Sequence, residues 1–431
     1  MNNEELRRNK YRRKKAMLRK VQNKMGVAFF VIILALFALA VRILLINYNH
    51  GEAYSKTVLD HQSYTSTTIP YKRGQIQDAN GTVLAYSERV YNLILDPKLI
   101  LSDEKYKEPT LTALTECFDL KRSDLESILA TKSTSQYEKL LKELTKDEIS
   151  EFESRVEDTK NNPYIKGVWF EDSYIRKYPF STLAADVIGF ASAANGGELG
   201  LENYYDEELS GTDGISYSYV GENLDVETQE KKAEDGYNLV TTIDYKVQSI
   251  IENKIKELNA ERPSKSTAVI AMNPKTGEIL AMASYPTFNL NNPRDLSGVY
   301  TQEELSTMTD IEMTNAMYAL WSNYCVSTIY EPGSTFKPFT VAEGLEEGVI
   351  HDGDTFYCGG FMEVSGSIIN CHEHSGHGTV TVKEGLIQSC NPTMMQIAAK
   401  LGGVKIAKYE ALFGFGNRTG IDKPVLQSVR R

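Results

Sequence analysis

The N-terminal segment constrains this chain more than any other part of the sequence. A basic stretch, residues 1–25, carries ten Lys and Arg residues against Glu4 and Glu5, and an almost purely apolar run follows at residues 26–47. Roughly 20 apolar helical residues are enough to span the hydrocarbon core of a membrane. We therefore predict a cytoplasmic basic tail at 1–25 and a single transmembrane helix at 26–47, with Arg42 reaching back to the headgroups.

The orientation of the chain follows from this arrangement. Lys and Arg are enriched on the cytoplasmic side of a membrane span, so the bulk of the chain, after about Asn47, is expected outside the cytoplasm at the cell membrane. A cleaved signal peptide is the alternative, but no small-x-small cleavage site follows the apolar run. Because the whole chain has a net charge of −11, the basic charge is local, and no nucleic-acid partner is expected.

Residues 48–236 contain short strand-like runs that alternate with charged helical stretches. Asn80-Gly81 lies between two alternating apolar runs, which is a strong hairpin signal because both positions tolerate positive φ. Apolar residues recur at helical spacing in the charged stretches, for example at Leu140, Leu141 and Leu144. We expect these leucines to face a core from a helix.

A second block begins near residue 237. Residues 238–244 are predicted to form a strand ending at a helix N-cap, Asp244, and residues 247–258 an amphipathic helix. Two apolar strands then follow, at 266–272 and 278–283, joined by a Pro/Gly turn. This order favours an antiparallel sheet with helices packed on it.

The sharpest chemical signal is a Ser-x-x-Lys motif formed by Ser334 and Lys337, which Pro332 and Gly333 place at the start of an apolar helical run. Residues three apart share a helix face, so the lysine amine is expected within reach of the serine hydroxyl. A serine is a weak nucleophile until a base takes its proton, and a lysine serves as that base when burial lowers its pKa. Taken alone, the motif also fits an ordinary helix start with a surface lysine.

A second motif, Ser389-Cys390-Asn391, changes that balance. A second serine and an amide are the groups needed to shuttle a proton and to hold a substrate amide. Together with residues 330–338, it resembles the first two motifs of penicillin-recognising serine enzymes.

The resemblance extends along the chain to the class B penicillin-binding proteins. Residues 73–85, 197–211 and 273–288 are similar to further segments of that family. The resemblance implies an α+β protein: a single N-terminal transmembrane helix, an elongated α/β pedestal domain of dimerisation type at 48–236, and a transpeptidase domain at 237–431. Residues 321–337 look closer to the division and sporulation branch than to the elongation branch.

The resemblance also implies roles and partners. Ser334 is expected to attack the D-Ala-D-Ala amide of a peptidoglycan stem peptide, Lys337 to act as its base, and Ser389 and Asn391 to serve proton transfer and positioning. β-Lactams are expected to acylate the same serine. The expected partners are a lipid-linked peptidoglycan precursor, the membrane, a glycosyltransferase and division-complex proteins. This chemistry requires no cofactor.

The chain departs from the family pattern in one respect. The family has a third motif, Lys-Thr-Gly or Lys-Ser-Gly, C-terminal to Ser-x-Asn, whereas the only Lys-Thr-Gly here, at 275–277, precedes Ser334 and is interpreted as a structural turn. We therefore expect an incomplete, C-terminally truncated transpeptidase domain with little or no turnover by itself. The alternatives are a non-catalytic membrane-anchored scaffold for cell-wall or division partners, and a β-lactam sensor or β-lactamase.

Cysteines and histidines gather around the second motif. Thiolates and imidazole suit zinc, and a closed set of four ligands makes a structural site. The candidate ligands are Cys358, Cys371, His377 and Cys390, with His372 or His374 as substitutes. A disulfide between Cys358 and Cys371 is the rival interpretation, since it is permitted outside the cytoplasm, and unlinked residues are the third.

Overall fold

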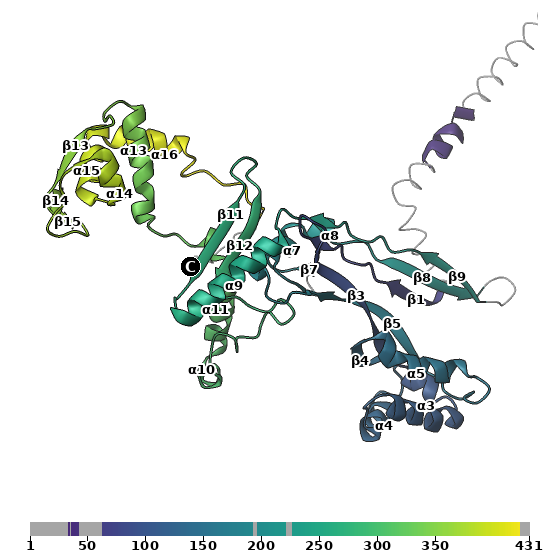
Figure 1. The fold of residues 1–431 in the computed structure, drawn as a ribbon. Helices are drawn as coiled ribbons and strands as arrows, with labels where there is room; N and C mark the ends of the chain where they lie inside the picture. Colours follow the sequence, from purple (N-terminus) through teal and green to yellow (C-terminus); the bar gives the residue numbers. More distant parts are fainter. Residues whose placement is uncertain (1–32, 35, 43–62, 193–195, 221–225, 423–431) are drawn as a thin grey trace, which may run out of the picture. The chain divides into compact units, whose positions relative to one another are not determined.

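The computed structural model describes residues 33–34, 36–42, 63–192, 196–220 and 226–422 (Figure 1). The chain divides into two compact units, each assembled from separate stretches of sequence. The first comprises Met1–Gly74, Glu88–Ile175 and Ser210–Tyr237, and the second comprises Gln75–Ser87, Arg176–Leu209 and Asn238–Arg431.

The predicted N-terminal segments lie mostly outside the described residues. The basic tail at 1–25 is entirely outside them, and of the anchor at 26–47 only residues 33–34 and 36–42 are described, as exposed helix. In the part of the chain that the structure describes, no helix combines the length and the apolar character needed to cross a membrane.

The first unit contains two groups of strands. The strands β1 (Ser63–Ile69), β8 (Gly214–Val220) and β9 (Val226–Lys231) form an antiparallel sheet in the order β1-β8-β9. The C-terminal part of β3 (Val83–Leu95) pairs with β4 (Glu138–Leu144), and β3 also pairs with β5 (Val168–Lys177).

Helices complete the first unit and enclose its core. They are α2 (Pro97–Ile100), α3 (Glu104–Cys117), α4 (Arg122–Thr131) and α5 (Lys146–Glu157). Leu93 and Leu95 of β3 are buried in one cluster with Leu114, Leu125 and Phe152 from the helices. This cluster is the hydrophobic core of the unit.

The helical prediction for Leu140, Leu141 and Leu144 is wrong. These residues lie in strand β4, where Leu141 and Leu144 pair with Leu93 and Tyr91 of β3, and they are only partly buried against the core. Short apolar runs fit both periodicities, and the hydrogen-bonding edge of β3 decides between them in the fold.

In the second unit, the predicted hairpin at Asn80-Gly81 is confirmed. It joins β2 (Ile76–Gln77) to the N-terminal part of β3, with Ile76 opposite Ala85. Gly81 has φ +85°, and the Asp78 carboxylate accepts hydrogen bonds from the backbone N–H groups of Asn80 and Thr82. The turn is therefore fixed by local chemistry.

The predicted helix and strand pair near the start of the second block are also confirmed. The helix is α9 (Tyr245–Glu261), whose first turn is capped by the Asp244 carboxylate. The strands β11 (Thr267–Met272) and β12 (Ile279–Tyr285) pair antiparallel, and α9 packs on β12. The strand predicted at 238–244 is shorter than expected, because only β10 (Leu239–Val240) pairs, in parallel with β2.

Shorter elements make up most of the rest of the second unit before residue 333. They are α6 (Ala185–Ile188), β6 (Ala191–Ser192), β7 (Gly196–Gly197), α7 (Gly200–Tyr204), α8 (Asp206–Leu209), α10 (Gln302–Thr307), α11 (Asp310–Trp321) and α12 (Tyr324–Ser327). The core includes Ile76, Ile188, Met282 and Trp321, which come from widely separated parts of the sequence.

Residues 333–412 form a lobe with a core of its own. Its helices are η1 (Gly333–Phe336), α13 (Lys337–Glu346), α14 (Val382–Ile387), α15 (Asn391–Leu401) and α16 (Gly403–Leu412). Its strands pair as β13 (Thr355–Cys358) with β16 (Gly378–Thr381) and as β14 (Phe361–Val364) with β15 (Ser367–Asn370). Val341, Phe356, Met394 and Ile397 are buried together, so α13, β13 and α15 are packed onto one another.

Candidate active site

The Ser-x-x-Lys motif lies at a helix start, as its sequence predicts. Ser334 is the second residue of the single-turn helix η1, and Lys337 is the first residue of α13, which continues from it. Gly333 has φ +56°, a conformation that glycine adopts without steric cost, and the chain thereby turns into the helix. The Ser334 side chain is exposed, which leaves it accessible to a substrate.

The Ser-x-Asn motif lies at the junction of two helices. Ser389 follows α14 and has φ +52°, in the left-handed region that non-glycine residues seldom adopt. Its backbone N–H donates to the carbonyl of Leu386, and Asn391 opens α15. Such strained positions cluster at functional sites, where the backbone aims a side chain.

The structure brings all four predicted catalytic residues together. The Ser389 hydroxyl donates to Ser334 Oγ across 3.0 Å. The Lys337 amine donates to Ser389 Oγ at 2.9 Å, to the Ser389 carbonyl at 2.6 Å and to Asn391 Oδ1 at 2.7 Å. Ser389 therefore bridges the predicted nucleophile, Ser334, and the Lys337 amine, so that a proton can pass between them through its hydroxyl.

Asn391 fixes the other end of this network. Its amide Nδ2 donates to the carbonyl of Asn370 at 2.8 Å while its Oδ1 accepts from Lys337. Burial lowers the pKa of Lys337 from the usual lysine value, and the nearby thiols of Cys371 and Cys390 act in the opposite direction. A lowered pKa raises the fraction of neutral amine, which is the form that accepts a proton.

Lys275-Thr276-Gly277 occupies the turn between β11 and β12. All three residues are exposed, Gly277 has φ +81°, and the backbone N–H of Lys275 donates to the Asn273 side chain. This geometry is that of a turn, as its position in the sequence predicts.

Two family profiles match the chain. One, described as "Penicillin-binding Protein dimerisation domain", matches residues 68–241. The other, described as "Penicillin binding protein transpeptidase domain", matches residues 267–428, which include Ser334, Lys337, Ser389 and Asn391.

Relatives match over most of the chain as well. It is 32% identical over 368 residues to "Stage V sporulation protein D" of Bacillus subtilis, which is 83% of this chain and 52% of that protein. It is 25% identical over 426 residues to "Peptidoglycan D,D-transpeptidase MrdA" of Acinetobacter baumannii, which is 93% of this chain and 60% of that protein. The chain belongs to the class B penicillin-binding proteins. It spans about half the length of the curated relatives it matches.

The fold of this penicillin-binding protein has solved counterparts. The structure of Penicillin Binding Protein 2X from Streptococcus thermophilus matches with a TM-score of 0.65 at 24% identity, covering 82% of this chain and 52% of that one. The penicillin-binding protein in a complex with MreC from Helicobacter pylori matches with a TM-score of 0.61 at 22% identity, covering 84% and 67%. The predicted α+β fold with dimerisation and transpeptidase domains is confirmed at this level.

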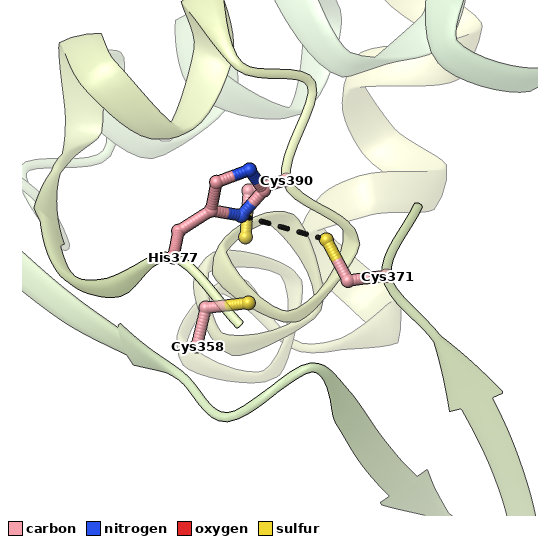
Figure 2. Close-up of side chains that lie close together, drawn as sticks. All are labelled: Cys358, Cys371, His377 and Cys390. Atoms are coloured by element: carbon pink, nitrogen blue, oxygen red, sulfur yellow. Dashed lines mark hydrogen bonds between the residues drawn. The ribbon is translucent and has the colours of Figure 1, made fainter. Parts of the chain in front are cut away.

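Beside the predicted catalytic residues, this penicillin-binding protein gathers three cysteines and a histidine. Cys358 ends β13, Cys371 follows β15, His377 precedes β16, and Cys390 lies between the two motif residues Ser389 and Asn391. One ligand atom from each of the four lies within 4.8 Å of the others. Figure 2 shows the three sulfur atoms and the imidazole ring pointing toward one another.

The environment of this cluster acts differently on its thiols, because burial raises the pKa of Cys390 whereas the pKa of Cys358 is lowered. The three cysteines are buried, and His377 is half-buried, with its Nδ1 3.6 Å from Cys371 Sγ. Burial opposes ionisation of Cys358, but hydrogen bonds from the backbone N–H groups of His377 and Gly360 outweigh it, so the pKa of this thiol is lowered. All three cysteines are free, so Cys358 and Cys371 do not form the alternative disulfide in this structure.

The sequence prediction and the structure differ at two histidines and one threonine near this cluster. His372 and His374, the substitute ligands, are exposed and lie outside the four-residue cluster. Thr393 was missed, although it is fully buried and its hydroxyl donates to Cys390 Sγ at 3.2 Å. Its position three residues after Cys390, at the start of a helix, is the signal that could have found it.

Proposed function

We propose that the site in this chain is that of a serine D,D-transpeptidase, in which Ser334 is acylated by peptidoglycan stem peptides and by penicillins. The observation that carries the proposal is the hydrogen-bonded chain from Ser334 through Ser389 to Lys337. It supplies a nucleophile, a proton relay and a base in one accessible place. Membership of a family whose named relatives include peptidoglycan D,D-transpeptidases supports the same chemistry.

The proposed reaction has two steps. In the first, Ser334 Oγ bonds to the carbonyl carbon of the penultimate D-Ala while its proton passes by way of Ser389 to Lys337. The C–N bond breaks, and terminal D-Ala leaves with that proton on its amine. In the second, an amine of another stem peptide attacks the ester and forms a new amide C–N bond, the Ser334 Oγ–C bond breaks, and the proton lost by the amine returns to Ser334 Oγ. A β-lactam enters the first step through its strained amide.

Covalent labelling by a fluorescent penicillin tests this proposal. The purified chain is expected to acquire one label per molecule at Ser334, located by peptide mass spectrometry, and Ser334→Ala is expected to acquire none. Thr335→Ala is the matched control, because its hydroxyl donates to the Pro332 carbonyl instead of joining the relay. Labelling that persists in Ser334→Ala, or a folded wild-type chain that takes no label, would contradict the proposal.

We further propose a single-pass membrane location, with the N-terminus in the cytoplasm and the bulk of the chain outside. The basic and apolar halves of residues 1–47 support it. The partners proposed with it are a lipid-linked precursor, a glycosyltransferase and proteins of the division or wall-synthesis machinery. The structural neighbour from Helicobacter pylori forms a complex with MreC, which supports a protein partner of that kind.

A further inference from the structure

We propose that Cys358, Cys371, His377 and Cys390 bind one zinc ion, and that this ion positions Ser389 and Asn391 for acyl transfer. The positioning part rests on the proposed transpeptidase function, whereas the metal part stands without it. The argument starts from the donor set. Three thiolates and one imidazole are soft and borderline ligands that select zinc among the common divalent ions, and four protein ligands make a closed structural site.

The distances fit a tetrahedral ion. Zinc bonds of about 2.3 Å to sulfur and about 2.0 Å to nitrogen place those two atoms about 3.5 Å apart. Cys371 Sγ and His377 Nδ1 are 3.6 Å apart, and all four ligand atoms lie within 4.8 Å of one another. The cluster therefore needs only small side-chain movements to close around an ion.

The backbone around the cluster is built to hold this geometry. Two loops approach so closely that only glycine fits: a Cβ at Gly376 would lie 2.4 Å from the Cys358 carbonyl oxygen, and one at Gly360 would lie 2.1 Å from that of His374. The Cys371 N–H donates to the Gly360 carbonyl at 2.8 Å. The protein thus orients the ligands with backbone contacts, as metal sites do with their outer shells.

Two of the four ligands are covalent neighbours of residues in the catalytic network. Cys390 separates Ser389 from Asn391, and Cys371 directly follows Asn370, whose carbonyl accepts the Asn391 amide. One ion bound to both cysteines would join the two segments that meet at this hydrogen bond. Ser389 holds a left-handed conformation that is not intrinsically preferred, so such a brace keeps its hydroxyl between Lys337 and Ser334.

The metal content of the purified full chain tests the first part. Elemental analysis in zinc-free buffers should find about one zinc per chain, and cobalt substituted for it should show the visible bands of a tetrahedral thiolate site. His377→Ala should lose the ion, while His377→Cys, which restores a fourth soft ligand, should keep it. His374→Ala is the matched control, because this exposed histidine lies outside the cluster and should keep full occupancy. A chain without bound metal, or His377→Ala with full occupancy, would overturn the zinc site.

A pair of glycine substitutions tests whether the loop approach builds the site. Gly376→Ala should lose zinc, because its Cβ would collide with the backbone of Cys358. Gly366 has a similar positive φ, +83° against +81° for Gly376, but a Cβ there would meet nothing within 4 Å, so Gly366→Ala should keep zinc. Equal metal content in the two folded variants would mean that the close approach of the two loops does not form the site.

The acylation rate tests the positioning part. Removal of zinc by a chelator should lower the rate of penicillin acylation about 10- to 100-fold, and added zinc should restore it. An unchanged rate in metal-free protein would overturn the positioning role and leave the zinc site standing. A zinc-loaded, folded chain that takes no penicillin would instead count against the transpeptidase function, so the two failures are distinguishable.

Discussion

At Ser389, the hydrogen bonds of the side chain and the conformation of the backbone favour different residue types. Its hydroxyl bridges Lys337 and Ser334, which requires a side chain, while its φ of +52° favours a residue without one. The left-handed conformation costs an ordinary L-residue about 1 kcal/mol or more. If the proposed relay operates, stability is given up at this position for its geometry.

Substitutions at Ser389 should separate the contributions of its side chain and its backbone. Both Ser389→Ala and Ser389→Gly remove the bridge and should slow acylation by about 10²- to 10⁴-fold, the range typical of a lost proton-transfer group. Ser389→Gly should nevertheless be about 1 kcal/mol more stable than Ser389→Ala, because glycine removes the left-handed strain. Penicillin acylation rates and denaturant melts measure the two effects.

Ser249, inside helix α9, provides the control for that comparison. There the order of stability should reverse, with the glycine variant about 1 kcal/mol less stable than the alanine variant, and acylation should stay unchanged. If glycine and alanine at Ser389 melted alike, the strain assigned to its backbone would be absent.

A second residue-scale prediction concerns the buried ion pair of Arg176 and Glu202. Their side chains are 6% and 0% exposed, Arg176 Nε lies 2.6 Å from Glu202 Oε1, and the Tyr178 hydroxyl donates to the same oxygen. Glu202→Ala removes this carboxylate from beside a buried guanidinium, so the free energy of unfolding should fall by about 3–5 kcal/mol. Urea unfolding of the variant and the wild type measures this loss of free energy.

The pair of Lys254 and Glu257 on α9 is the matched control, since its side chains are 71% and 62% exposed. Glu257→Ala should cost less than about 1 kcal/mol. Equal losses in the two variants would show that burial does not govern the Arg176 pair.

The sequence predicts most members of the proposed catalytic cluster, but it does not predict which hydrogen bonds connect them. The spacing of Ser334 and Lys337 predicts a shared helix face, which puts the amine near the hydroxyl. In the structure the amine bonds to Ser389 and Asn391, and the nucleophile is reached through Ser389. That connection depends on how α14 and α15 pack against α13, and no local pattern encodes it.

At the scale of elements, one carboxylate links two helices of the active-site lobe, which is formed by residues 333–412. Glu347, the C-cap residue of α13, accepts from Lys405, Lys408 and Tyr409 of α16. Hydrogen bonds from Lys405, then Lys408 and Tyr409, lower the pKa of Glu347 to about 2. Because the folded-state pKa is depressed, this link stabilises the protein fully above the unfolded pKa of about 4.3 and is lost as the pH falls toward 2.

The pH dependence of Glu347→Gln tests that link. Near pH 6 the variant should melt at a lower temperature than the wild type, and the difference should shrink steadily between about pH 4.3 and pH 2. Glu346→Gln is the control, because in the described structure this neighbouring carboxylate has no ion pair with α16. A melting difference that stays constant across this pH window would contradict the assignment.

Strong local signals predicted elements well, and short ambiguous ones did not. The Asn80-Gly81 hairpin and the Asp244 cap depend on residues that act on the backbone next to them, so the sequence predicts both. Leu140, Leu141 and Leu144 fit a helix and a strand equally, and pairing with β3, distant in sequence, selects the strand. Tertiary partners decide such segments, which is why their type could not be derived locally.

At the scale of the whole molecule, the chain crosses repeatedly between its two compact units. Gln75–Ser87 and Arg176–Leu209 belong to the unit that holds the predicted catalytic residues, although the first unit lies before, between and after them in sequence. A linear pattern suggests consecutive blocks, and only the burial of Ile76 and Ile188 with Met282 and Trp321 reveals the exchange. Family resemblance supplies domain names without showing how the compact units are interleaved.

Separate cores predict that the two units respond differently to core damage. Phe152 is 1% exposed in the core of the first unit, and Phe356 is 5% exposed in the core of the active-site lobe. Each phenylalanine-to-alanine change should cost about 3–5 kcal/mol locally. Since multidomain proteins seldom unfold in one transition, calorimetry should show at least two transitions, and each variant should lower a different one. Phe356→Ala should also slow penicillin acylation near its melting range, whereas Phe152→Ala should leave it unchanged while the second unit is folded. If both variants lowered a single common transition, the units would unfold as one cooperative body, and the cores would not be energetically separate.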